Sequence, residues 1–170
     1  MDYFIMKTDK RLRRLPQIQL PQELFNTEST KTAIVYVKEH NGLSIDYADY
    51  LEKPSPMIAD KFRKILQKYQ QDMVFRRVML VEKETGQQKP YYLMLPADIV
   101  CADKDESKYD AGGTVQNFVL DIEKTGKRKI FLAKDYNKQL IVRLDVAESV
   151  LRREANGIWF EPVKISGRSR

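Results

Sequence analysis

Two stretches of the sequence, 85 residues apart, share one pattern: an amphipathic helix that leads into a strand of the form Phe-x-x-Val. At this spacing apolar residues align in pairs: Ile65 with Val150, Leu66 with Leu151, Met73 with Ile158, Phe75 with Phe160, Val78 with Val163 and Leu80 with Ile165. Ala33–Val35 likewise aligns with Phe118–Leu120. The period is too long for a solenoid, so we predict repeat-like halves at about 33–80 and 118–165. A chance match at this one spacing is the alternative.

Strands are predicted wherever β-branched and aromatic residues gather between turn signals. They cover residues 3–7, 33–37, 73–82, 91–95, 115–122, 129–133, 139–143 and 158–165. The turn at 84–87 joins two of them in a hairpin, but the strand at 91–95 has no counterpart in the second half, because the chain ends first. We expect an α+β fold, a mostly antiparallel sheet with two principal helices. It forms a single domain over 1–170, with 1–44 as an N-terminal extension and a polar, frayed tail at 166–170.

Capping residues mark where the two helices are expected to begin. Ser55 suits an N-cap and Pro56 suits the first helical position, and the apolar face that follows holds Ile58, Phe62, Ile65, Leu66 and Tyr69. Asp145 and Glu148 have the spacing of a capping box. The second helix would therefore begin at Asp145 and end before Asn156-Gly157, with an apolar face of Val146, Val150 and Leu151.

Cysteine and histidine each occur once, as Cys101 and His40. These residues cannot form an intramolecular disulfide or a tetrahedral zinc site built only from Cys and His. His40 lies beside Asn41-Gly42 and is expected to be a solvated turn residue, and Cys101 is expected to be a small buried residue. We therefore expect a protein that is not an enzyme, with no catalytic residue, no metal site and no cofactor.

The chain is basic, with 30 Lys and Arg against 24 Asp and Glu and a net charge of +6. Such a surface attracts nucleic acid, anionic lipid or an acidic protein. The alternative function is therefore a basic nucleic-acid-binding module that uses Lys61, Lys64, Lys68, Lys127, Arg128 and Lys129.

Two short stretches, residues 45–52 and 103–110, are acidic instead. The first places tyrosines among carboxylates just before the first helix, and tyrosine is favoured at interface hot spots. We therefore predict a partner-binding patch of Tyr47, Asp49, Tyr50 and Glu52, with Asp103, Asp105 and Glu106 as outlying members. The alternative is that the tyrosines only pack against the helix.

Several segments together resemble one bacterial family. They are Ile58-Ala59-Asp60-Lys61-Phe62, Val74-Phe75-x-x-Val78, Tyr91–Pro96, Leu144–Glu148 and Gly157–Val163. This set is similar to the eleventh immunity-protein family of polymorphic toxin systems, formerly a domain of unknown function. The resemblance covers about 45–165 well and 1–44 loosely. Its motifs are mostly hydrophobic framework and include no catalytic motif.

The resemblance implies a non-enzymatic protein that binds and neutralises a cognate toxin by occluding it. Immunity proteins against nucleases are often acidic, because complementary charge speeds association. For this basic chain three alternatives stay open: the partner is not a basic nuclease, the stretches 45–52 and 103–110 supply a local acidic face, or the domain has another function. No apolar run approaches the about 20 residues that span a membrane, the start is a poor signal peptide, and a lone cysteine fits a reducing compartment. We therefore expect a cytoplasmic protein with no membrane partner.

Overall fold

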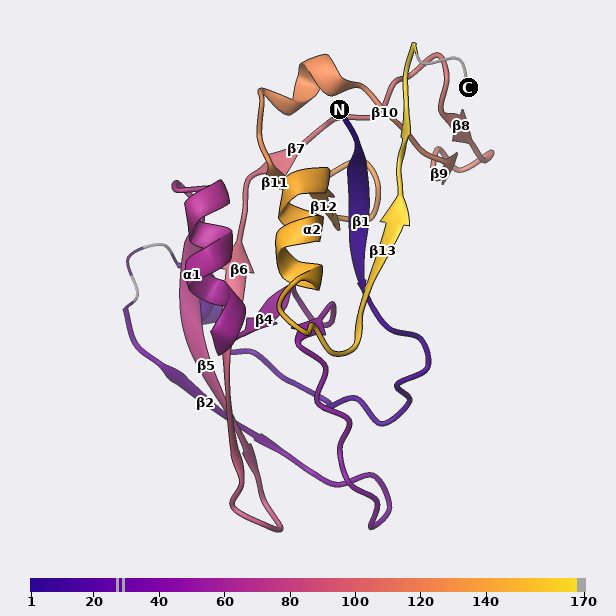
Figure 1. The fold of residues 1–170 in the computed structure, drawn as a ribbon. Coiled ribbons are helices and arrows are strands. Elements are labelled where there is room, and N and C mark those ends of the chain that lie inside the picture. Colours follow the sequence, from indigo (N-terminus) through magenta and orange to yellow (C-terminus); the bar gives the residue numbers. More distant parts are fainter. Residues whose placement is uncertain (27, 29, 168–170) are drawn as a thin grey trace. The chain divides into compact units, whose positions relative to one another are not determined.

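The computed structural model describes residues 1–26, 28 and 30–167 (Figure 1). The predicted frayed tail therefore lies outside the described residues from residue 168 onward. The chain divides into two compact units. Unit 1 comprises Met1–Met6, Pro96–Arg152 and Phe160–Arg170, and unit 2 comprises Lys7–Leu95 and Arg153–Trp159.

The sheet of unit 2 has five strands in the order β2-β5-β6-β4-β3. Their bounds are β2 (Ala33–Val37), β3 (Tyr50–Leu51), β4 (Met57–Ala59), β5 (Val74–Glu82) and β6 (Gln88–Leu95). β2 runs parallel to β5, and the other neighbours are antiparallel. β5 and β6 form the hairpin expected from the turn at 84–87, whose Gly86 has a φ of +69°.

Helix α1 (Asp60–Tyr69) follows β4 directly. The predicted start at residue 56 is wrong, because the N-cap is Ala59 and no side chain caps the helix. Met57 and Ile58 are fully buried and pair with β6 as part of the sheet. Tertiary strand pairing therefore overrides the local capping signal of Ser55.

Apolar side chains cover both faces of the unit 2 sheet. α1 crosses β5 and β6 (Figure 1) and buries Phe62 and Leu66 completely. On the other face, two segments pack against Val35, Leu80 and Leu93. They are the segment before β2, which includes the short 3-10 helix η1 (Gln22–Phe25), and the loop before β3. The packed residues are Leu12, Leu15, Ile18, Leu20, Leu24 and Ile45. Much of the expected N-terminal extension therefore belongs to the core of unit 2.

The larger sheet of unit 1 has the order β13-β1-β12-β11-β7. Its strands are β1 (Tyr3–Thr8), β7 (Asp98–Ile99), β11 (Ile130–Ala133), β12 (Gln139–Arg143) and β13 (Ile158–Pro162). Two smaller sheets pair β8 (Lys108–Tyr109) with β9 (Val115–Asn117), and β10 (Val119–Leu120) with β14 (Lys164–Ile165). The strand predicted at 115–122 is thus broken at Phe118, and the 3-10 helix η2 (Ile122–Thr125) follows it.

Helix α2 (Leu144–Leu151) follows β12 and begins one residue earlier than predicted. Its N-cap is Arg143, and the predicted capping box does not form, because the Asp145 carboxylate accepts hydrogen bonds from the Arg143 guanidinium instead. Val146 and Val150 are buried as expected, but Leu151 is 57% exposed because the helix ends there. Two helices and mostly antiparallel sheets confirm the α+β class.

The two units repeat one strand arrangement. In unit 2, β4 leads into α1 and then β5, and β6 lies between the two strands. In unit 1, β12 leads into α2 and then β13, and β1 lies between them. Each unit also has a parallel pair, with Val35 opposite Leu80 in one and Leu120 opposite Ile165 in the other. These two pairs are separated by the same 85 residues as the apolar pattern of the sequence.

β1 holds in unit 1 the place that β6 holds in unit 2. The two strands read Tyr-Phe-Ile-Met at residues 3–6 and Tyr-Tyr-Leu-Met at residues 91–94, with the same order of buried and partly exposed side chains. The Val163 amide donates to the Tyr3 carbonyl oxygen at 3.0 Å, and its equivalent Val78 lies opposite Tyr91. The counterpart that the second half lacks in sequence order therefore comes from the N-terminus of the chain.

Candidate functional site

The residues of the predicted patch at 45–52 differ in how far they reach solvent. Tyr50, expected at the surface, is 1% exposed, because it belongs to β3 and faces the core. Tyr47 is partly buried, and its hydroxyl donates to the buried Glu82 carboxylate at 3.1 Å. Burial and the Glu82 charge raise the pKa of Tyr47 well above its usual value. The Tyr50 ring is therefore buried, whereas Tyr47 stays partly exposed with its hydroxyl bonded inside unit 2.

Asp49 is committed to contacts inside unit 2. Its carboxylate accepts the Asn156 amide at 2.6 Å and lies 2.8 Å from the Lys61 ammonium, while its own amide donates to the Asn156 carbonyl. These contacts hold the segment after α2 to the loop before β3. Glu52 is the member of the patch whose partly exposed carboxylate has no such role, since its amide alone donates to Thr8 Oγ1.

The outlying acids lie in unit 1, in the loop after β7. Asp103 Oδ1 accepts the amides of Asp105 and Glu106 at 2.9 and 3.0 Å, so this carboxylate shapes the turn. Those backbone hydrogen bonds, that of Glu106 first, lower the pKa of Asp103. Asp105 is exposed, and Glu106 lines a cavity. The predicted patch is thus divided between the units, with 45–52 in unit 2 and 103–106 in unit 1.

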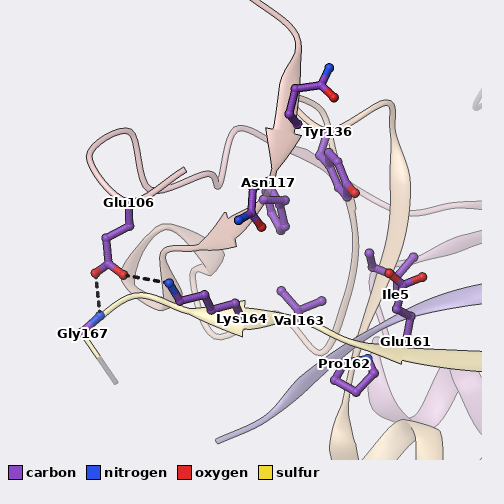
Figure 2. Close-up of a pocket in the computed structure, with 11 residues that line it drawn as sticks. Ile5, Glu106, Asn117, Tyr136, Glu161, Pro162, Val163, Lys164 and Gly167 are labelled. Atoms are coloured by element: carbon purple, nitrogen blue, oxygen red, sulfur yellow. Dashed lines mark hydrogen bonds and ion pairs between the residues drawn. The ribbon is translucent and has the colours of Figure 1, made fainter. Parts of the chain in front are cut away.

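The cavity in unit 1 has a volume of about 940 Å³ and opens beside β13 and β14. Figure 2 shows Glu106 at one end of it, where the carboxylate accepts the Gly167 amide at 2.9 Å and lies 4.0 Å from the Lys164 ammonium. Glu161 lies on β13, next to Ile5 (Figure 2). The rim of the cavity is thus charged, with carboxylates at both ends.

An aromatic pair forms the wall of this cavity. The rings of Phe118 and Tyr136 stack with centroids 4.6 Å apart and planes 3° apart. Phe118 is buried between β9 and β10, and Tyr136 lies partly exposed in the turn between β11 and β12. A stacked pair beside carboxylates can bind a planar or cationic side chain through stacking and cation–π contact.

Sequence reasoning did not predict this site, although Glu106 was among its candidates. Phe118, Tyr136 and Glu161 are not among the predicted site residues. The signal available in the sequence was Tyr136, a large aromatic residue within the polar turn at residues 134–138. A side chain of this size is unusual in a turn if only solvent surrounds it.

The single histidine and the single cysteine each contact another group of the chain. No cluster of three or more His, Cys, Asp or Glu residues there could hold a metal ion. Cys101 is fully buried, and burial, followed by the Asp135 charge, raises the pKa of its thiol to about 12. His40 Nε2 lies 2.8 Å from the Leu15 carbonyl oxygen.

The basic residues of the alternative function are divided between the units. Lys61, Lys64 and Lys68 lie on α1 in unit 2, and Lys61 pairs with Asp49. Residues 127–129 lie in unit 1, where the Lys129 ammonium is 4.0 Å from the Asp145 carboxylate. The predicted basic residues therefore form one segment in each unit.

No model of a known protein family matches the chain, and no curated protein matches it. The resemblance to the immunity-protein family thus stays a prediction from the residues quoted above. Among the described residues, no helix combines the length and the apolar character that crossing a membrane requires.

Proposed function

We propose that this chain is a non-enzymatic, immunity-type protein of the cytoplasm that binds a partner toxin and neutralises it by occlusion. The observation that carries the proposal is the cavity in unit 1, where the stacked rings of Phe118 and Tyr136 stand beside carboxylates. A concave site with an aromatic wall and a charged rim suits a protruding side chain of a protein partner. The resemblance to immunity proteins supports the same function.

The charge of the site indicates the chemistry of the inserted group. Glu106 and Glu161 line the cavity, and the exposed Asp105 lies in the adjacent loop, while Lys164 pairs with Glu106. An arginine of the partner would stack on the rings and meet these carboxylates, and arginine is enriched at hot spots. This local acidic face allows a chain of net charge +6 to bind a basic toxin.

Occlusion requires only a surface of ordinary interface size, about 800 Å² per partner. The partner's active cleft would be covered by unit 1 around the anchored side chain, so no chemical step is needed for neutralisation.

The test begins with a pull-down of the tagged protein from its native lysate after nuclease treatment, read by mass spectrometry. We expect one stoichiometric protein, encoded by a neighbouring gene, that is toxic when expressed alone and harmless when co-expressed with this chain. Recovery of nucleic acid alone, lost after nuclease treatment and weakened steeply by salt, would replace the proposal by the nucleic-acid-binding module.

Variants of this chain then show which of its residues bind the captured partner. Tyr136→Ala is expected to weaken binding more than tenfold, as hot-spot truncations do. Tyr109→Ala, which removes an exposed ring on β8 outside the cavity, is the matched control and should leave affinity unchanged. Asp105→Lys should slow association, whereas Glu123→Lys on η2 should not. If the two variants of each pair changed binding equally, the cavity would not be part of the interface.

A further inference from the structure

The free edge of β2 exposes two large apolar side chains. β2 lies at the end of its sheet, with β5 on one side only. Val35 and Val37 face the core, whereas Ile34 and Tyr36 are each 61% exposed. Exposed apolar residues on an edge strand are a ready template for pairing with another strand.

The backbone groups of Ile34 and Tyr36 point away from β5. The Lys83 amide donates to the Val37 carbonyl, so Val37 and Val35 direct their polar groups toward β5. Alternate residues of a strand direct theirs to the opposite edge. Within the described residues, no hydrogen bond reaches these outward groups of Ile34 and Tyr36.

A groove of about 670 Å³ runs beside this edge. One wall is β2 itself, and the opposite wall is the extended segment that carries Gln17, Gln19 and Pro21. Lys38, Glu39 and Lys83 supply the charged residues of its lining, and the Lys83 ammonium lies 6.0 Å from the centre of the Tyr36 ring. No ion pair among the described residues involves either lysine.

The equivalent edge in unit 1 is already occupied. β10 corresponds to β2 at the 85-residue spacing, and its outer edge pairs with an antiparallel segment in which Ala102 lies opposite Leu120. The Asp103 amide donates to the Val119 carbonyl at 2.8 Å, and the Asp121 amide donates to the Cys101 carbonyl at 2.9 Å. The Val119 carbonyl and the Asp121 amide correspond, 85 residues earlier in the sequence, to the Ile34 carbonyl and the Tyr36 amide.

We propose that the free edge of β2 binds an extended segment of a partner protein, which adds to the sheet of unit 2 as an antiparallel strand centred opposite Val35. The geometry of residues 101–103 on β10 supplies the template. Main-chain hydrogen bonds hold such a strand, and pockets for alternate side chains select it. This site is separate from the cavity of unit 1, and its test does not depend on the proposed function.

The template also sets the chemistry of the segment. Its central residue is small, because Ala102 fills that position in unit 1. The residues on either side of it face Tyr36 and Ile34 and are apolar. The residue three places before the centre lies next to Lys38. It is acidic, because the two lysines, Lys38 and Lys83, outnumber the one carboxylate, Glu39, that lines the groove.

A partner segment fits this groove better than a second copy of the chain. A second β2 would bring its own wall of residues 17–21 and its own sheet to the same edge. A lone extended segment needs only the space between β2 and Gln19.

The test uses the intact protein and a dye-labelled, acetylated peptide. Five consecutive residues of the peptide are glutamate, threonine, isoleucine, alanine and isoleucine, and the alanine is the central residue opposite Val35. We expect saturable binding by fluorescence anisotropy and slower hydrogen exchange of the Tyr36 amide. Tyr36→Pro removes that donor on the side away from β5, where an edge strand tolerates proline. It should weaken binding about tenfold relative to Tyr36→Val, which keeps the donor.

A second probe tests the same interface without altering the protein. N-methylation of the final isoleucine removes the peptide donor to the Ile34 carbonyl and should also weaken binding about tenfold. No saturable binding, or equal binding by the proline and valine variants and by both peptides, would overturn the proposal. Sedimentation that shows a dimer broken by Tyr36→Pro would overturn it in favour of a second copy at this edge.

Discussion

Replacement of Gly157 by alanine is expected to destabilise unit 2 through both backbone conformation and packing. Gly157 has a φ of +71°, in the left-handed region that favours glycine. A Cβ there would lie 2.6 Å from Leu12 Cδ1 and 2.7 Å from Ala48 Cβ. The end of the leucine side chain can move, but Ala48 is fully buried and its carbonyl accepts the Tyr91 hydroxyl at 2.7 Å. Ala48 therefore cannot easily give way.

The magnitude follows from adding two effects. A non-glycine residue in the left-handed region costs about 1–2 kcal/mol, and overpacking of a filled core costs about 1–3 kcal/mol. Gly157→Ala should therefore lose about 2–5 kcal/mol of unfolding free energy. Gly86→Ala is the matched control in the same unit, because its φ is +69° and nothing lies within 4 Å of the added Cβ. It should lose only the conformational part.

Urea unfolding followed by circular dichroism measures both variants against the unmodified chain. We expect Gly157→Ala to lose at least about 1 kcal/mol more than Gly86→Ala, with an unchanged denaturant slope. Equal losses would show that the Leu12 and Ala48 contacts yield freely, and the packing argument would then be refuted.

Three further predictions follow from single groups. The Cys101 thiol has a pKa of about 12 and should resist a thiol reagent at pH 8 in the folded chain. It should react at once in urea, and rapid labelling without urea would contradict its burial. The pKa of Asp145 is lowered chiefly by hydrogen bonds from Arg143. Asp145 therefore stabilises the fold above its unfolded pKa of about 3.9, and this contribution is lost as the pH falls through the lower pKa of the folded state. Urea midpoints of Asp145→Asn should therefore fall less steeply than those of the unmodified chain below pH 4, and parallel curves would refute this linkage. Asp49→Ala should cost about 1–3 kcal/mol because it removes the hydrogen bond from the Asn156 amide to a charged carboxylate, whereas Glu52→Gln should stay within about 0.5 kcal/mol; the two melting temperatures decide between structural and surface roles.

Local patterns were sufficient where one face of a strand is buried. β2 spans Ala33–Val37 as predicted, because β-branched residues between turn signals suit a pleated, half-buried surface. The hairpin of β5 and β6 followed from its turn residues. Helix starts were less predictable, since Ser55 has the local character of an N-cap but the next residues are taken by the sheet.

The partner-binding candidates show where residue type alone is a poor guide. Tyr50 and Asp49 have the composition of a hot spot, yet one faces the core and the other anchors Asn156. Composition does not specify that both residues of the short strand β3 are buried. Glu106 stays a predicted partner-binding residue, and the cavity that it lines also needs residues of β9, β13 and β14, of which β13 and β14 lie far along the chain.

The sequence by itself determined the α+β class, most strands and the 85-residue correspondence between its halves, because these follow from short-range apolar periodicity. Only the tertiary structure decided that β1 occupies in unit 1 the place of β6, that Phe118 stacks on Tyr136, and that one equivalent edge is filled while the edge of β2 is free. These features arise from pairing between residues distant in sequence. Such pairing is selected by the burial that the whole sheet achieves, and no local window contains that information.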